Sequence, residues 1–305
     1  MTDFYEKNPV FPENRVPEKV KCVVITGPTA TGKTALAVQM AKKFNAQIIS
    51  ADSRQVYRGL DIGSGKDLEE YENVPYHLID IADPAKEVYN LARFCRDAFD
   101  AIRKIRDAGQ LPILCGGTAL YLLALLDGYH LPGGELPPRS SGVPRVRRNS
   151  GLADSFIPPF ELDALILGVY YPRNEVRERI RIRLDKRLEQ GMLDEGRKLL
   201  DSGVTMQQLE FFGLEYREMA YHLAGKCTFE EMRNTLLNRI RQFAKRQDIF
   251  FRKIEKEGHP VYWLAQADPV MAQNLIERFL SGSPLPEITF KLTDVINPDN
   301  HKKSR

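Results

Sequence analysis

The chain has 305 residues, of which 43% are hydrophobic and 28% charged, as in ordinary globular proteins of one or two domains. Lysine and arginine number 44 against 41 aspartates and glutamates, so the total charge neither requires nor excludes a polyanionic partner. The four cysteines are scattered, with no CxxC pair and no histidines at metal-ligand spacing, which argues against a disulfide framework and a structural zinc site.

The first 20 residues are polar and contain prolines, and we expect them to form an N-terminal arm. They lack the apolar core of a signal peptide, and no window of the chain approaches about eighteen apolar residues. This pattern argues against export and against membrane insertion. Together with the scattered cysteines, it favours a cytoplasmic protein.

Strands and helices alternate through the next hundred residues. Short apolar runs predict strands, whereas apolar residues at helical spacing predict helices. The expected elements are a strand at 21–27, a helix at 33–44, a strand at 46–52, a helix at 91–109 and a strand at 111–117. Because such alternation is typical of parallel sheets covered on both faces, the predicted fold is α/β, a P-loop NTPase-like parallel sheet flanked by helices.

The composition changes at residues 131–159, which are rich in proline, glycine and arginine and have no periodic apolar face. We predict an exposed basic loop there. A strand follows at 163–171 and a helix at 172–200, with Pro172 suited to the helix start. The apolar stripe of this helix is expected to be Val176, Ile180, Leu184 and Leu188.

A second helical section precedes the end of the chain. Thr228 and Glu231 fit a capping box ahead of a long helix. A strand at 261–264 and a helix near 268–281 complete the pattern. The predicted organisation is an N-terminal arm (1–20), the first part of the core (21–131), a flexible basic loop (132–160), core completion with a helical acceptor-binding part (161–283) and a C-terminal tail (284–305).

The sequence GPTATGKT at residues 27–34 satisfies the Walker A pattern GxxxxGK[ST], with a predicted strand before it and a helix after it. Glycines let the backbone N–H groups approach a phosphate, and the helix N-terminus adds a favourable dipole. Lys33 would neutralise phosphate oxygens and the Thr34 hydroxyl would hold Mg²⁺. The alternative is a glycine-rich turn without a ligand. The diphosphate-binding residues are therefore predicted to be Gly27, Pro28, Thr29, Ala30, Thr31, Gly32, Lys33 and Thr34.

Such a motif identifies the anion and leaves the reaction open. The bound diphosphate can belong to a nucleotide such as ATP that is cleaved between phosphates, or it can leave whole from carbon. A P-loop nucleotide or small-molecule kinase is therefore one hypothesis.

Asp52 ends the second predicted strand, at the sheet edge where ligands bind in open parallel sheets. Its carboxylate could hold magnesium through water or accept a proton from a nucleophile, and the alternative is that it only caps the next turn. Gly116, Gly117 and Thr118 follow another strand in the same way. They present backbone N–H groups and a hydroxyl to the cleft, or they only form a tight turn.

Several separated motifs, in order, resemble the tRNA dimethylallyltransferase (tRNA isopentenyltransferase) family. The resemblance covers roughly residues 21–131 and 161–264. The motifs are GPTATGKTALA, IISADSRQVYRGLDIGSGK, PYHLIDIADP, LPILCGGTALYL, ERIRIRLDKRLEQGMLDEGRKLL, GLEYREMAYHLAGK and RIRQFAKRQDIFFRK.

This resemblance implies transfer of a dimethylallyl group from dimethylallyl diphosphate to N6 of adenosine 37, beside the tRNA anticodon, with release of pyrophosphate. It implies that Asp52 is the base, supported by Thr29 and Thr118. Arg179 and Arg183, four residues apart on one helix, resemble the family's arginines near the diphosphate; the alternative is a solvated helix flank. Mg²⁺, the tRNA anticodon stem-loop and dimethylallyl diphosphate are the implied cofactor and partners. The sequence does not indicate an oligomeric state, and a monomer is our working expectation.

The residues expected to contact tRNA or its adenosine come from two segments. The first resembles the family's adenosine-recognition stretch, and Thr118 from the later glycine turn is added to it. The second is a basic helix with phenylalanines that either stack on bases or lie in the core. These residues are Asp52, Ser53, Arg54, Gln55, Thr118, Arg241, Lys245, Arg246 and Gln247, with the aromatic residues Phe243, Phe250 and Phe251.

The chain also departs from the family pattern. Bacterial members carry a helical insertion between the segments GGTALYL and DALILGV, with a stretch resembling DRQRIIRALE, and here only the basic loop with Arg139, Arg145, Arg147 and Arg148 occupies that interval. GSGKD also stands where GTAKP is common. The shortened insertion region leaves open an enzyme that prenylates a free adenine nucleotide, as adenylate isopentenyltransferases do, and a non-catalytic RNA-binding relative. The retained basic helix favours tRNA.

Overall fold

The computed structural model describes residues 19–130, 155–156, 158–289 and 291–292. Six parallel strands form one sheet in the order β3-β2-β4-β1-β7-β8. Their bounds are Lys19–Thr26 (β1), Ala46–Ser50 (β2), Tyr76–His77 (β3), Leu111–Cys115 (β4), Glu161–Tyr170 (β7) and Val261–Ala265 (β8). The predicted parallel α/β sheet is confirmed, and strands from both sides of the basic loop contribute to it.

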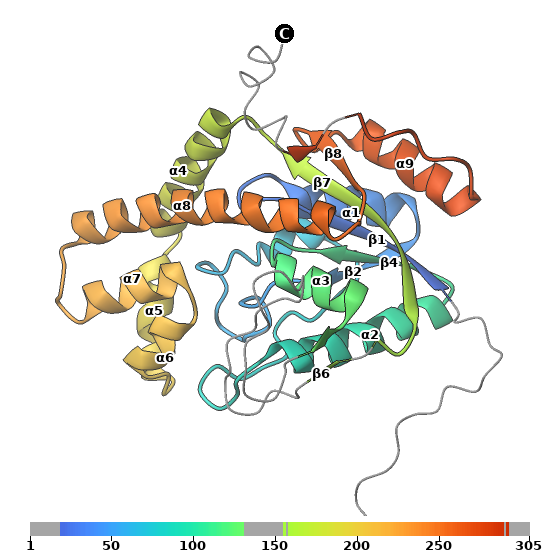
Figure 1. Cartoon of the computed structure of the whole chain (residues 1–305). Helices are drawn as coiled ribbons and strands as arrows, with labels where there is room; N and C mark the ends of the chain where they lie inside the picture. Colours follow the sequence, from blue (N-terminus) through green and yellow to red (C-terminus); the bar gives the residue numbers. More distant parts are fainter. Residues whose placement is uncertain (1–18, 131–154, 157, 290, 293–305) are drawn as a thin grey trace, which may run out of the picture.

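Side chains along the central strand β1 alternate between two cores. Cys22 and Val24 belong to the larger core, which α2 (Leu91–Asp107) and α3 (Ala119–Asp127) cover. Val23 and Ile25 belong to the other, which α1 (Lys33–Lys43) and α9 (Pro269–Ser281) cover. Figure 1 shows these two helical layers on opposite faces of the sheet. A strand buried on both faces explains why its sequence is a continuous apolar run.

A helical portion stands beside the sheet, next to the carboxyl ends of its strands (Figure 1). It consists of α4 (Arg173–Glu189), α5 (Met192–Asp201), α6 (Met206–Phe211), α7 (Leu214–Leu223) and α8 (Phe229–Lys256). The predicted capping box of α8 is confirmed, because Thr228 accepts a hydrogen bond from the backbone of Glu231 and the Glu231 carboxylate accepts one from the backbone of Thr228. The structure describes no helix that is both long and apolar enough to cross a membrane.

The prediction of a single helix over 172–200 is wrong, because the structure has two helices there. Gly191 adopts φ 94° and separates α4 from α5. This left-handed conformation is favourable for glycine and ends the first helix. Pro172 precedes the first helical residue as its N-cap.

Most of the predicted basic loop, residues 131–154 and 157 with its four arginines, lies outside the described residues. Its ends meet in the short antiparallel pair β5 (Tyr129–His130) and β6 (Ser155–Phe156). The Phe156 ring packs against Phe99 and Tyr129. The expectation of an irregular loop to residue 159 is therefore wrong at 155–156, where one aromatic side chain reaches the core without any periodic pattern.

Residues at the two ends of the predicted organisation also belong to the packed structure. Lys19 and Val20, expected in the arm, belong to β1. In the expected tail, Leu292 is buried and its N–H donates to Glu255 Oε1 at 3.3 Å.

Candidate active site

The Walker A segment forms a tight loop between β1 and α1. Gly27 has φ 150°, and a Cβ there would stand 2.5 Å from the carbonyl oxygen of Val169, so only glycine fits. The Thr31 hydroxyl donates to the Pro28 carbonyl at 2.8 Å and braces the loop. Helix α1 begins at Lys33 without an acidic residue in its first turn. The positive end of its dipole is therefore free to attract an anion.

A cavity of about 930 Å³ opens over this loop. The predicted P-loop residues 29–34, the segment 52–55 and the turn 116–118 all line it. Burial lowers the pKa of Lys33, and the negative charge of Asp52 partly opposes this shift. The lysine and the carboxylate therefore lie within electrostatic range of each other in one cavity, as the sequence predicted.

Asp52 begins a turn and faces the cavity at the same time. Its Oδ1 accepts a hydrogen bond from the Arg54 N–H at 2.8 Å. Its other carboxylate oxygen makes no hydrogen bond with the part of the chain that the structure describes. The turn-capping interpretation is thus correct for one oxygen, and the second remains available to a ligand.

The turn after β4 packs tightly against the phosphate loop. A Cβ on Gly116 would stand 2.3 Å from the Ala51 carbonyl oxygen, and the Thr26 hydroxyl donates to the Gly116 carbonyl at 2.8 Å. These contacts explain the glycine by backbone packing. Thr118 is the N-cap residue of α3 but makes no side-chain cap hydrogen bond, and it lines the cavity.

Gln247 of α8 joins the two loops. Its Oε1 accepts from the Thr29 N–H at 3.0 Å, and its Nε2 donates to the Gly117 carbonyl at 3.1 Å. Because both ends of the amide are used and the residue is buried, Gln247 lies at the site as a clamp of the phosphate loop.

The two predicted arginines of α4 contact the P-loop. Arg179 donates from Nε to the Ala30 carbonyl at 2.7 Å and lies over the Tyr171 ring. Arg183 lies 3.4 Å from the Thr29 hydroxyl and donates to Asp67 at 2.8 Å. Both line the cavity, and neither is merely part of a solvated helix flank.

Several charged residues that the sequence analysis did not single out also line the cavity, and two of them, Arg187 and Glu215, have clearly shifted pKa values. Arg187 is buried on α4, while Leu188, predicted for that stripe, is only half-buried. Burial lowers the pKa of Arg187 to about 10, so it stays charged at neutral pH. Burial also raises the pKa of Glu215 on α7, while the charges of Arg187 and Arg183 lower it. The recurrence of arginine at 179, 183 and 187 was the available signal.

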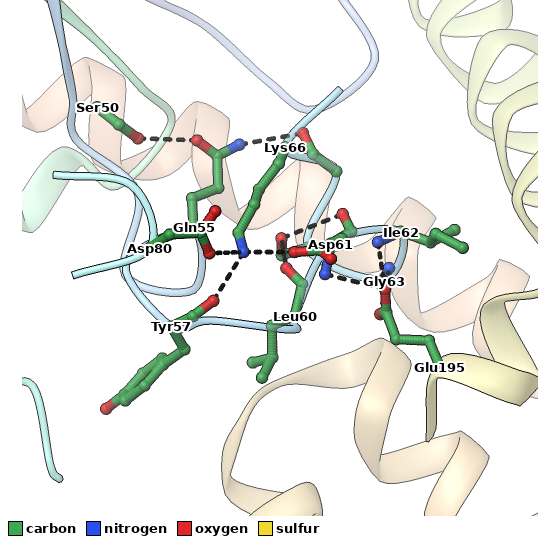
Figure 2. Close-up of polar contacts among 12 residues, drawn as sticks. Ser50, Gln55, Tyr57, Leu60, Asp61, Ile62, Gly63, Lys66, Asp80 and Glu195 are labelled. Carbon is green, nitrogen blue, oxygen red and sulfur yellow. Dashed lines mark hydrogen bonds and ion pairs between the residues drawn. The ribbon is translucent and has the colours of Figure 1, made fainter. Parts of the chain in front are cut away.

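The loop after Asp52 is held from two sides, as Figure 2 shows. Glu195 of α5 accepts the backbone N–H groups of residues 61–63 at 2.9, 2.6 and 3.0 Å, and it also accepts the Tyr216 hydroxyl at 2.7 Å. Lys66, fully buried, donates to the Tyr57 carbonyl and to Asp61 and is paired with Asp80. These bonds fix one wall of the cavity.

The remaining predicted adenosine contacts of the segment after Asp52 line the cavity, but they differ in how far the protein already occupies their polar groups. Gln55 accepts from the Ser50 hydroxyl at 2.8 Å and donates to the Gly65 carbonyl at 3.0 Å, so its amide is bound within the protein. The Arg54 guanidinium lies 5.5 Å from the centre of the Phe211 ring, and Ser53 lines the cavity.

Helix α8 carries the predicted basic and aromatic residues on different faces. Phe251 is buried in the core, whereas Phe243 and Phe250 are 44% and 50% exposed and line the cavity. Lys245 and Arg246 are exposed outside it, and Arg241 is half-buried. The helix therefore presents two exposed aromatic rings to the cavity, whereas Lys245 and Arg246 are exposed outside it.

The residues at the P-loop are compatible with Mg²⁺, although the described residues contain no group of three or more potential ligands of the His, Cys, Asp or Glu type. Thr34 and Asp52 line the cavity together. Magnesium commonly takes one or two protein oxygens and completes its coordination with phosphate and water, so such a sparse set fits a magnesium diphosphate.

The fold and the site define a P-loop protein whose phosphate cradle opens into a large cavity with a carboxylate on its wall. The model described as IPP transferase matches residues 55–153 and 141–254, and the model described as Isopentenyl transferase matches residues 20–75. The chain belongs to the tRNA dimethylallyltransferase (tRNA isopentenyltransferase) family.

Curated relatives match most of the chain. It is 40% identical over 285 residues to tRNA dimethylallyltransferase 1 of Geotalea daltonii, covering 81% of this chain and 92% of that protein. It is 39% identical to tRNA dimethylallyltransferase 2 of Shewanella sediminis, with coverages of 82% and 95%. The full-length tRNA isopentenylpyrophosphate transferase of Bacillus halodurans has a similar structure, with a TM-score of 0.71, 31% identity and coverages of 87% and 98%.

Proposed function

We propose that this protein transfers a dimethylallyl group from dimethylallyl diphosphate to N6 of adenosine 37 in tRNA. In this reaction the N6 lone pair forms a bond to C1 of the dimethylallyl group. The C1–O bond breaks, and its electron pair leaves with pyrophosphate. The proton of the N6 amine passes to a base, so atoms and charges balance.

The P-loop binds the leaving group in this proposal. The backbone amides of residues 30–34 surround the diphosphate, and Lys33, Arg179 and Arg183 neutralise the charge that develops on it. Thr34 is the residue that would hold Mg²⁺ there. A bound magnesium ion would supply further charge neutralisation to the diphosphate.

Asp52 is the proposed base. The observation that carries this assignment is that Asp52 and Lys33 line the same cavity and that the charge of Asp52 raises the pKa of Lys33, so an acceptor amine above the cradle lies between proton acceptor and leaving group. An exocyclic adenine amine is a weak nucleophile, and a positioned proton acceptor is what its attack needs.

The mouth of the cavity supports a nucleic-acid acceptor. Phe211, Phe243 and Phe250 line it and are exposed, as a base leaving its stack would require of its contacts. Lys245 and Arg246 are exposed on the same helix as two of these rings, where they would contact phosphates. A solved eukaryotic dimethylallyltransferase acting on tRNA, at 24% identity, shares the fold with a TM-score of 0.73.

A monomeric enzyme is part of this proposal. A tRNA acceptor would place the protein in the cytoplasm.

The test is a transfer assay with labelled dimethylallyl diphosphate and three possible acceptors or donors: tRNA lacking the modification, AMP, and ATP as an alternative donor. Label on tRNA adenosine is expected. Label only on AMP would instead identify an adenylate isopentenyltransferase, and phosphate transfer from ATP would identify a kinase. Salt-sensitive tRNA binding without any transfer would identify a non-catalytic RNA-binding protein.

A further inference from the structure

Arg187 is a buried guanidinium with unused hydrogen-bond donors. Only 8% of the residue is exposed, and its Nε and Nη2 atoms are buried without a hydrogen-bond partner. A buried charged group left in this way is costly, and in native proteins it usually has a partner such as a water or an ion. The side chain lines the main cavity, so a ligand can supply that partner.

The terminal nitrogens of Arg187 and Arg183 lie side by side. A Cβ on Gly65 would stand 1.7 Å from Nη2 of Arg187 and 2.6 Å from Nη2 of Arg183. Both guanidinium groups approach one carboxylate oxygen, Asp67 Oδ2, at 3.6 Å and 2.8 Å respectively. Two cations therefore share one exposed carboxylate, and the longer contact leaves Arg187 without a hydrogen bond.

This pair is continuous with the phosphate cradle. Arg183 reaches the Thr29 hydroxyl, and Arg179, one helical turn earlier, stands with Nη2 3.8 Å from the position of a Cβ on Gly32. A smaller cavity of about 20 Å³, lined by Thr29, Ala30, Arg183, Arg187 and Glu215 among others, joins Arg187 to the P-loop. The recurrence at every fourth residue aligns the three arginines along one helix face that begins at the loop.

We propose that Arg187 is a third arginine contact for the diphosphate, and that Asp67 pairs with its guanidinium and that of Arg183 until the anion displaces the carboxylate. This inference rests on the proposed function, because the anion is the one seated in the P-loop. A planar guanidinium offers paired donors that match phosphate oxygens, which a single ammonium cannot do. Glu215 lines both cavities with Arg187, and its charge raises the pKa of Arg187.

The experiment measures pyrophosphate binding by calorimetry, with Mg²⁺ present, for the wild-type protein, Arg187→Met, Arg187→Lys and Arg181→Met. Arg181 is the matched control because it lies on the same helix and pairs with Glu178 and Asp185. Arg187→Met should weaken pyrophosphate binding by about tenfold to a hundredfold, and Arg187→Lys by less. Arg181→Met should bind as the wild type does, and tRNA affinity should be the same in all four proteins.

Asp67→Asn separates a ligand contact from a structural role. If Asp67 competes with the anion, its neutralisation should tighten pyrophosphate binding several-fold. If Arg187 only stabilises the fold through Asp67, the same change should weaken binding or leave it unchanged, and that result would overturn the proposal. Equal pyrophosphate affinity in Arg187→Met and wild type would overturn it too, as would a loss confined to tRNA binding. Absence of pyrophosphate binding and of prenyl transfer in the wild type would instead refute the proposed function.

Discussion

Two buried cations near the cavity, Lys66 and Arg187, differ in how completely the protein satisfies them. Lys66 is fully buried and has a backbone carbonyl and two carboxylates around its ammonium group. Arg187 is almost as buried but has no hydrogen bond at two of its three nitrogens. The comparison teaches that a satisfied buried charge fixes a loop, whereas an unsatisfied one at a cavity is available to a ligand. The first group should therefore affect stability and the second function.

The largest effect should come from a residue that acts on the ligand in the cavity. Asp52→Asn removes the proposed base while keeping the size of the side chain and its turn hydrogen bond. Prenyl transfer should fall by about 10²- to 10⁴-fold, while pyrophosphate affinity and the melting temperature change little. Single-turnover transfer and calorimetry on the same preparations check this. Loss of pyrophosphate binding in parallel with transfer would show that Asp52 acts on the metal or on the structure.

On the stability side, Glu195→Ala should have the larger effect. Three backbone N–H groups, near Glu195 in Figure 2, lose their common acceptor. The Tyr216 hydroxyl loses the same acceptor. Because the carboxylate is buried, we expect the free energy of unfolding to fall by about 3 kcal/mol in urea denaturation. Glu189→Ala, at an exposed position of α4, is the control and should stay within about 0.5 kcal/mol of wild type. Equal stability of the two variants would contradict the anchoring role of Glu195.

Lys66→Met tests the satisfied cation itself. The variant leaves the Tyr57 carbonyl without its donor, but Asp61 and Asp80 keep side-chain exposures of 56% and 36% and can be hydrated. We therefore expect a smaller loss, about 2 kcal/mol, with pyrophosphate binding retained. The exposed ion pair of Lys42 and Glu72 supplies the control, since Lys42→Met should cost less than about 0.5 kcal/mol. If Lys66→Met is as stable as the wild type but cannot bind pyrophosphate, then Lys66 acts on the ligand as Arg187 is proposed to, and its structural role is contradicted.

The smallest effect concerns a buried carboxyl beside the Gln247 clamp. Burial raises the pKa of Asp248 from 3.8 to about 6, against the opposing charges of Arg173 and Arg252. The folded state thus holds the proton more tightly than the unfolded state, so the stability it contributes is complete below about pH 3.8 and is lost as the pH rises through about 6. Asp248→Asn should raise the free energy of unfolding at pH 7 by about 1–2 kcal/mol and flatten this decline. Urea denaturation from pH 4 to 7 measures it, and an unchanged slope would contradict the assignment.

The elements with a local sequence signal were predictable. The continuous apolar runs of β1, β2 and β4 indicated buried parallel strands, and the capping box at Thr228 marked the start of α8. The P-loop, Asp52 and the turn at Gly116 follow such strands, so their meeting at one sheet edge followed from the parallel topology. Here local pattern and tertiary structure agree.

Side-chain partners were not predictable, because they depend on contacts between distant segments. Gln55 and Gln247 were interpreted as adenosine contacts, but their amides are bound within the protein. Arg187 was overlooked because arginine is normally exposed, and its burial beside Gly65 comes from a segment far away in the sequence. The break at Gly191 was hidden because helical residues continue on both sides of it.

The pairing of β5 with β6 has a consequence for how this fold tolerates change. It brings residues 130 and 155 next to each other, and the neighbouring Tyr129 and Phe156 pack in the larger core. The entropy of closing a chain between two fixed points rises only with the logarithm of its length. Segments of very different size can therefore be grafted between these two anchors at a nearly constant thermodynamic penalty, which makes this junction a natural point for exchanging one accessory piece for another.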